Sequence, residues 1–166
     1  MTIKTIIKCQ KKIIRIDSKR GRCSMSLEEN KAVIRKTMET VNKRNLALLD
    51  ELIAPDYVDT TLQVKGLEGF KQSVTLLYKG FPDIHSTIED IIAEGDKVWD
   101  RVTVTATHKG EYRGLAPTGK KITFRGVRIW RIVDGKVVER ESFYDFLDFY
   151  KQIGVIEYIG FPDEVK

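Results

Sequence analysis

The stretch KKITFRGVRIWRIVDGKVVERESFY, residues 120–144, decides the fold of this chain. Val, Ile and aromatic residues recur on both sides of Asp134-Gly135, a dipeptide typical of the tight turn in a β-hairpin. The stretch therefore predicts two long antiparallel strands, residues 120–133 and 136–144.

The Asp-Gly turn also predicts a register, because a two-residue loop pairs Val133 with Lys136. If no bulge interrupts the ladder, the opposed pairs are Phe124 with Asp145, Gly126 with Phe143, and Arg128 with Glu141. These six side chains then share one face of the hairpin. We expect that face to line a ligand pocket, with Gly126 leaving room for the ligand.

A second hairpin precedes the first. Two β-rich runs, residues 84–94 and 97–109, flank the turn dipeptide Gly95-Asp96. Residues 114–119 read as a loop between the hairpins, and residues 146–153 as a short closing helix. Four long antiparallel strands are therefore expected.

Helical patterns occupy the chain ahead of the strands. Ser26-Leu27-Glu28-Glu29 is a capping box, and apolar residues follow it at helical spacing up to Val41. Asn45 offers a second N-cap for a helix that Pro55 stops, and a third helix begins near Leu67 and ends before Pro82. A short extended stretch, residues 57–59, separates the last two helices.

Three helices followed by long antiparallel strands define an α+β order. Strands of this length coil strongly, and helices packed on the concave side of a coiled sheet enclose a cavity. We expect a single domain shaped as a cone with a pocket, because 166 residues of 42% hydrophobic content suffice for one core.

The positive charge of the chain is concentrated at one end. Its net charge is +5, and residues 1–24 hold eight Lys or Arg against the single acid Asp17, so the remainder has a net charge of −2. Nucleic-acid binding by the core is therefore disfavoured. Two readings stay open: Met25 is the true start, or residues 1–24 are a basic extension. We expect the chain to divide into a basic extension (residues 1–24), one domain (residues 25–156) and a C-terminal tail (residues 157–166).

Several classes of protein are disfavoured by the sequence. No apolar run approaches the ~18 residues that cross a bilayer, and no secretory signal is evident, so we expect a cytoplasmic protein without membrane contact. Cys9 and Cys23 lie outside the foldable segment and are expected to be free thiols. His85 and His108 lack a third ligand at a familiar spacing, so no metal is expected.

Five short motifs occur in the order and spacing of one known family. They are Phe81-Pro82-Asp83, Thr107-His108-Lys109-Gly110, Pro117-Thr118-Gly119-Lys120, Asp134-Gly135-Lys136, and Asp145 seven residues before Gln152-Ile153-Gly154. On these motifs, residues 26–156 resemble the SnoaL-like polyketide cyclases, whose cone-shaped α+β fold is of the nuclear transport factor 2 (cystatin-like) kind.

The resemblance implies a function and a site. It implies a cofactor-independent cyclase or isomerase-type enzyme that acts on a hydrophobic carbonyl compound, with Asp145 as general acid/base in an aldol ring closure. A carboxylate does this best in a dry pocket that raises its pKa. An alternative for Asp145 is an N-cap of the closing helix. Proteins of this fold usually pair through the open sheet face, so a homodimer or higher homo-oligomer is expected.

Further residues are candidates for the substrate pocket, beside Asp145 as catalytic residue. They are Tyr57, Trp99, Arg101, Phe124, Arg128, Glu141 and Phe143. Arg128 is the candidate for stabilising an oxyanion, and its alternative is an ion pair with Glu141 on a solvated face. The alternative for Arg101 is a structural pair with Asp90, and large aromatics such as Trp99 and Tyr57 often pack in a core instead.

The chain departs from the family pattern at some positions. Glu141 stands near a usual tryptophan, Thr60 at a common histidine and Ala106 at a frequent glycine, so the substrate of the antibiotic-pathway cyclases does not carry over directly.

Two rival functions remain. One is a non-catalytic domain of the same fold that binds a small molecule or supports assembly. The other is a limonene-type epoxide hydrolase, which the segment Arg101-Val102-Thr103 disfavours because the Arg-x-Asp element of those enzymes lacks its aspartate here.

Overall fold

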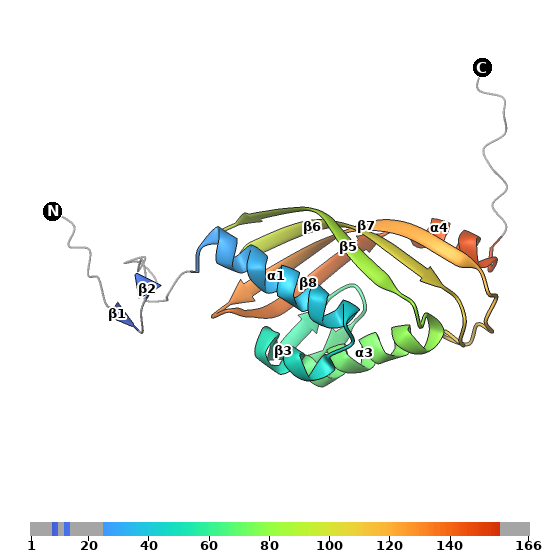
Figure 1. Cartoon of the computed structure of the whole chain (residues 1–166), viewed down its shortest axis with the longest axis horizontal. Helices are drawn as coiled ribbons and strands as arrows, with labels where there is room; N and C mark the ends of the chain where they lie inside the picture. Colours follow the sequence, from blue (N-terminus) through green and yellow to red (C-terminus); the bar gives the residue numbers. More distant parts are fainter. Residues whose placement is uncertain (1–7, 10–11, 14–24, 157–166) are drawn as a thin grey trace, which may run out of the picture.

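The computed structural model describes residues 8–9, 12–13 and 25–156 (Figure 1). Its elements are β1 (Lys8–Cys9), β2 (Lys12–Ile13), α1 (Leu27–Asn42), η1 (Leu46–Leu48), α2 (Leu49–Leu52), β3 (Ile53–Asp59), β4 (Val64–Lys65), α3 (Gly66–Gly80), β5 (His85–Glu94), β6 (Lys97–Thr107), β7 (Lys121–Val133), β8 (Lys136–Tyr144) and α4 (Phe146–Ile153). β1 and β2 pair with each other. The remaining expectations for residues 1–24 and 157–166 lie outside the described residues.

A curled six-stranded sheet forms the body of the domain, with strand order β4-β3-β8-β7-β6-β5. The predicted hairpins are confirmed as β5–β6 and β7–β8, with ends within two residues of those expected. The sheet is mixed rather than antiparallel throughout, because β3 pairs in parallel with β8. The sequence shows only a short extended stretch at residues 57–59 and does not reveal this pairing.

The capping box begins α1 as predicted. The Ser26 hydroxyl accepts a hydrogen bond from the Glu29 amide, and the Glu29 carboxylate accepts one from the Ser26 amide. The predicted second helix is shorter than expected, since a 3-10 turn and the four-residue α2 replace it. Asn45 makes no capping bond there. Pro55 disfavours helical backbone at the residue before it, so the chain turns into β3 at Ile53.

The helices cover the inner face of the curled sheet, as Figure 1 shows for α1 and α3. Ile34 and Met38 of α1 and Phe70 and Val74 of α3 pack in one core with inner-face residues of the sheet such as Trp130. The expected cone with helices on its concave side is therefore confirmed. No helix of residues 25–156 is long and apolar enough to cross a membrane.

A β-bulge near the turn of the last hairpin changes the face that each residue of β8 presents. Ile132 pairs with Val137 but Arg131 pairs with Glu139, so Val138 is the extra residue. A one-residue shift moves every following side chain to the other face. The predicted register is therefore wrong beyond the bulge.

The corrected register pairs Arg128 with Ser142 and Gly126 with Tyr144. Arg140, Ser142 and Tyr144 consequently face inward. The expectation that Gly126 leaves room for ligand is also wrong, because the Tyr144 ring occupies that space: a Cβ added at Gly126 would lie 2.3 Å from Tyr144 Cδ1.

The Phe81-Pro82-Asp83 motif ties the start of β5 to the end of β6. Asp83 accepts hydrogen bonds from the Thr107 amide (2.7 Å) and the Thr107 hydroxyl (2.6 Å). These bonds hold the pKa of Asp83 below its usual value, and the bond from the Thr107 hydroxyl has the largest effect. The motif thus has a structural role.

Gly126→Ala is predicted to destabilise the domain by about 1–3 kcal/mol, because the new methyl group overlaps the Tyr144 ring and the Phe143 carbonyl. Urea unfolding measures the change. Arg125→Lys, an exposed neighbour on the same strand, is the control and should leave the midpoint unchanged. Equal midpoints for Gly126→Ala and the native protein would show that the Tyr144 ring does not lie against residue 126.

Thr107→Val is predicted to remove part of the stability that depends on ionised Asp83. The folded pKa is lowered, so this stability is present above the unfolded pKa of about 4 and is lost as the pH falls through the folded pKa. Unfolding free energies at a series of pH values should differ between variant and native protein at neutral pH and converge in acid. A difference that persists unchanged in acid would contradict this origin.

Candidate functional site

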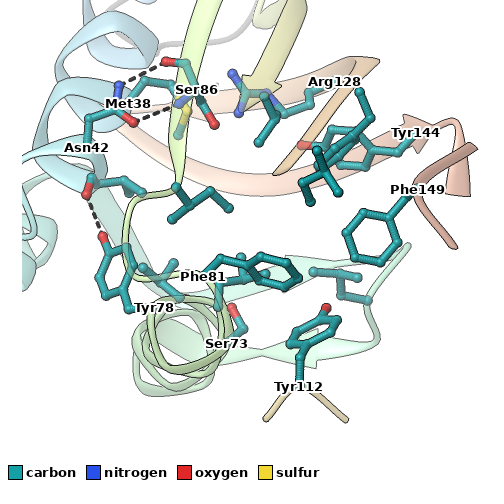
Figure 2. A pocket seen from close by; sticks show the side chains of 18 of the residues that line it. Met38, Asn42, Ser73, Tyr78, Phe81, Ser86, Tyr112, Arg128, Tyr144 and Phe149 are labelled. Atoms are coloured by element: carbon teal, nitrogen blue, oxygen red, sulfur yellow. Dashed lines mark hydrogen bonds between the residues drawn. The ribbon is translucent and has the colours of Figure 1, made fainter. Parts of the chain in front are cut away.

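The space between the helices and the inner face of the sheet contains a cavity of about 120 Å³ (Figure 2). Apolar and aromatic residues make up most of its wall, among them Met38, Val74, Phe81, Phe124 and Phe149. A cavity of this size compares with the engineered one of roughly 150 Å³ that binds benzene. It accommodates about one ring of an apolar compound.

One wall of the cavity is polar and has Arg128 at its centre. Arg128 is buried, and its Nε donates to Asp100 Oδ1 (3.1 Å) while its Nη2 bonds to Asp100 Oδ2. Asp100 Oδ1 also accepts from Trp130 Nε1 (2.9 Å). Asp100 lies directly across the ladder from Arg128, so adjacent strands fix the orientation of the guanidinium.

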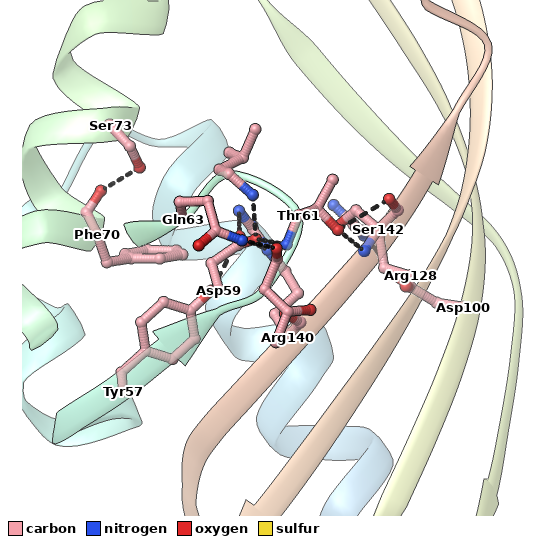
Figure 3. A network of polar contacts seen from close by, with 12 residues as sticks. Tyr57, Asp59, Thr61, Gln63, Phe70, Ser73, Asp100, Arg128, Arg140 and Ser142 are labelled. Atoms are coloured by element: carbon pink, nitrogen blue, oxygen red, sulfur yellow. Dashed lines mark hydrogen bonds and ion pairs between the residues drawn. The ribbon is translucent and has the colours of Figure 1, made fainter. Parts of the chain in front are cut away.

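Arg140, whose side chain is 11% exposed, forms a second ion pair on the same wall with the fully buried Asp59, drawn in Figure 3. Its Nε donates to Asp59 Oδ2 (2.7 Å), and its Nη2 also contacts Asp59. The two guanidinium carbons lie 5.2 Å (Arg128) and 5.3 Å (Arg140) from the Trp130 ring centroid. The indole therefore has a cation near it from each pair, a favourable arrangement for an aromatic ring.

Arg140 stays charged in this buried position. Burial works to lower its pKa, but Tyr57 and Asp59 raise it, and the net effect is upward. Arg140 and Tyr144 also interact electrostatically. The cavity therefore has fixed positive charge and a phenol on one wall.

Tyr144 completes this wall, and its strand neighbour Ser142 shares the inward face of β8 without lining the cavity. Along β8 they follow Arg140 on the inward face, and Ser142 lies across from Arg128. Tyr144 lines the cavity, at the same end as Arg128 in Figure 2. The Ser142 side chain is 4% exposed, and its Oγ has no hydrogen-bond partner among the described residues.

The other end of the cavity is closed by aromatic rings. Tyr112 contacts Phe81 and Phe149 edge to face, and burial raises the pKa of Tyr112, so its hydroxyl remains protonated at neutral pH. Buried His108 stacks on Phe81, and its Nδ1 lies 3.2 Å from Thr118 Oγ1. Three of the sequence motifs, those that contain Phe81, His108 and Thr118, thus support this end of the cavity.

Two of the residues predicted for the pocket, Phe124 and Arg128, line the cavity. The alternative ion pair of Arg128 with Glu141 is wrong, because Arg128 pairs with Asp100 and Glu141 is exposed on the opposite face.

Asp145 does not face the cavity, so that expectation is wrong. It is exposed and N-caps α4, with its Oδ1 accepting from the Asp148 amide (2.9 Å). The predicted alternative, helix capping, is what the structure shows. The physical reason is the bulge: β8 ends at Tyr144, which takes the inward position, and Asp145 begins the turn into α4.

The remaining pocket candidates lie elsewhere, which corrects those predictions. Tyr57 is fully buried in the core behind the cavity, where its ring packs against Phe70. Trp99, Arg101 and Phe143 lie on the outer face of the sheet with Glu141. Strand alternation explains the position of Trp99 and Arg101, because the even-numbered residues of β6 point inward. The predicted Arg101–Asp90 pair is confirmed.

Two residues of the polar wall, Arg140 and Tyr144, are not predicted from the sequence. Each is adjacent in sequence to a predicted pocket residue, and only the bulge separates the two sets. Two adjacent valines at 137 and 138 interrupt the alternation of β8, but this signal is too weak to locate a bulge.

The cavity wall limits the chemistry that the chain can perform. Among its lining residues there is no Asp, Glu, His or Cys, and no group of three or more such residues within the described residues could hold a metal ion. Guanidinium, phenol, hydroxyl and carboxamide groups are the polar groups that this lining presents to a ligand.

Comparison with known proteins agrees with the fold. The family model for SnoaL-like polyketide cyclases matches residues 31–153. The aklanonic acid methyl ester cyclase AcmA of Streptomyces galilaeus is 28% identical over 134 residues, which cover 77% of this chain and 92% of AcmA.

Two solved structures are similar as well. AclR, a putative hydroxylase from Streptomyces galilaeus, has a TM-score of 0.72 and 30% identity, over 81% of this chain and 91% of AclR. IdmH, a putative polyketide cyclase from Streptomyces antibioticus, has a TM-score of 0.66 and 29% identity, over 75% of this chain and 98% of IdmH. With a family match across most of its described domain, this chain belongs to the SnoaL-like polyketide cyclase family.

Proposed function

We propose that the protein is a polyketide-cyclase-type enzyme that closes a ring within a small carbonyl compound by forming a carbon–carbon bond. The observation that carries the proposal is an apolar cavity with two charged arginines fixed on one wall. The family and the cyclase AcmA support the same type of reaction.

An aldol ring closure develops negative charge on oxygen twice. Removal of a proton from carbon beside a carbonyl gives an enolate, and its attack on a second carbonyl gives an alkoxide. Fixed donors in apolar surroundings stabilise such oxyanions better than water does, because they need no reorientation. Asp100 and Trp130 hold Arg128 in one orientation, so Arg128 suits this role.

Tyr144 is the group that we assign to proton transfer. The net reaction moves one proton from carbon to the alkoxide oxygen, so a single acid/base group can both accept it and return it. Tyrosine can act in this way when it starts as the phenolate, which takes the proton from carbon and returns it to the alkoxide. Tyr144 lines the cavity and interacts electrostatically with Arg140, whereas Asp145 is exposed and caps α4.

The size of the cavity bears on the substrate. About 120 Å³ holds one ring, so a multi-ring compound such as aklanonic acid methyl ester would extend out of the cavity. We propose a substrate with a small reacting end. The epoxide hydrolase alternative loses support, because Arg101 lies outside the cavity on the outer face of the sheet.

A second candidate is a non-catalytic binding domain of the same fold. The absence of Asp, Glu and His from the described lining favours it, since these are common acid/base groups. Ligand bound in the cavity without any ring closure would support this candidate over the enzyme.

Tyr144→Phe is predicted to lower kcat by about 100-fold or more, because it removes only the hydroxyl that transfers the proton. The assay incubates aklanonic acid methyl ester and smaller carbonyl compounds with the protein. A cyclised product has the mass of its substrate but a different chromatographic retention time.

Asp145→Asn is the matched control, since Asn also caps helices while lacking the basic carboxylate. We expect it to retain turnover. A loss of 100-fold in Asp145→Asn with full activity in Tyr144→Phe would contradict the assignment and restore Asp145 as the base.

The outer face of the sheet supports the proposal of a homodimer or higher homo-oligomer. Ile92, Trp99 and Phe143 are 67%, 44% and 58% exposed. Ile92 pairs directly with Trp99, so an apolar strip crosses neighbouring strands. Exposed apolar patches of this kind commonly mark protein interfaces.

Trp99→Glu is predicted to convert the oligomer into a monomer, because it places a charge at the centre of this strip. Light scattering coupled to size-exclusion chromatography gives the mass of each species. Thr105→Glu, on the same face of β6 but beyond the strip, should leave the mass unchanged. A native protein that already elutes as a monomer would refute the expectation.

A further inference from the structure

The polar wall of the cavity contains more hydrogen-bond donors than acceptors. We define this wall as Arg128, Arg140 and Tyr144. Its two carboxylate partners, Asp59 and Asp100, are both completely buried, at 1% exposure each. The hydrogen bonds that these carboxylates accept determine how many N–H donors of the guanidinium groups remain free to bind a ligand.

Asp59 accepts bonds from uncharged donors in addition to Arg140. Its Oδ1 accepts from the amides of Thr61 (3.0 Å) and Leu62 (2.8 Å). Its Oδ2 accepts from Arg140 and from the Tyr57 hydroxyl (3.3 Å). Since a carboxylate has about four lone-pair sites, Asp59 is saturated.

Asp100 is shared in a similar way. Trp130 Nε1 donates to the same oxygen as Arg128 Nε. Backbone, phenol and indole donors therefore stabilise part of the negative charge of Asp59 and Asp100. Without these donors, the arginines alone would stabilise it.

The guanidinium groups, in contrast, are incompletely paired. Each has five N–H donors, and Nε and Nη2 are the atoms that contact the aspartates. No other acceptor among the described residues contacts either group, and both arginines line the cavity. Donors without protein acceptors are thus present where a ligand would lie.

We propose that the substrate carries a free carboxylate, which binds to the polar wall through Arg128 and Arg140. This inference rests on the proposed function of the same cavity. A carboxylate presents only acceptors and a full charge, and its bonds to guanidinium are charge-assisted. A methyl ester lacks the charge, so the substrate class differs from that in the name of the relative AcmA, a methyl ester cyclase.

The rest of the cavity specifies what the carboxylate is attached to. Phe81, Phe124 and Phe149 surround a volume of about 120 Å³, which fits one apolar ring. The ligand class is therefore an aromatic or similarly apolar carboxylic acid rather than a small inorganic anion.

Three probes of nearly equal size test the proposal on the native protein, and calorimetry gives their affinities at physiological salt. They are benzoate, methyl benzoate and the cation benzamidine. Benzoate is expected to bind at least about 10-fold more tightly than methyl benzoate, and benzamidine is expected not to compete. Intermolecular NOEs from benzoate to the rings of Phe124 and Tyr144 should place it in the cavity.

Arg128→Lys tests the wall itself, because it keeps a charge opposite Asp100 but loses the planar fork of donors. Benzoate affinity should fall at least about 5-fold, with methyl benzoate affinity unchanged. Arg101→Lys is the matched control: Arg101 also pairs with an aspartate, but on the outer face, so its affinities should equal the native ones.

The outcomes separate this inference from the proposed function. Equal affinities of benzoate and methyl benzoate in the native protein would overturn the carboxylate site and leave ring closure untouched. Binding of benzamidine in preference to benzoate would also overturn it. Failure of all three probes to enter the cavity would overturn both proposals, because both place the ligand there.

Discussion

The burial of two arginines beside one tryptophan is the constraint on which the rest of the structure depends. A buried charge is tolerated only when it is paired and hydrogen-bonded. Asp59 and Asp100 provide this from β3 and β6, the strands on either side of the β7–β8 hairpin. The parallel pairing of β3 with β8 is what brings Asp59 to Arg140. The polar wall thus needs all four strands, and replacing either aspartate would leave an uncompensated charge in the core.

The bulge at Val138 converts this arrangement into a site. Without it, Glu141 and Phe143 would face the helices, and the cavity would contain an acid in place of Arg140. With it, Arg140 and Tyr144 face the cavity beside Arg128, while Phe143 joins Ile92 and Trp99 on the exposed outer face. One extra residue therefore determines what β8 contributes both to the cavity and to the surface that we propose for assembly.

Much of the fold could be predicted from the sequence, because its signals are local. Turn dipeptides at 95–96 and 134–135, the capping box at Ser26 and the strand periodicity define β5–β8, α1 and α4 to within two residues. The site could be predicted only in part, because it depends on pairings between distant segments. Arg128 and Phe124 lie on the strand before the bulge, and the sequence predicts their inward face correctly, whereas the predicted face is wrong for every candidate after the bulge. The contact of Asp100 with Arg128 follows from the inward-facing positions of β6, but an ion pair with Glu141 satisfies the sequence equally well.

Arginine side-chain NMR tests the central claim most directly, since the Nε–H groups of buried, ion-paired arginines exchange slowly with water. The account predicts two protected Nε–H signals in the native protein, from Arg128 and Arg140, each assigned by its loss in the corresponding lysine variant. The signal of Arg101 should exchange fast. Rapid exchange of every arginine Nε–H would show that neither ion pair is buried and would contradict the polar wall.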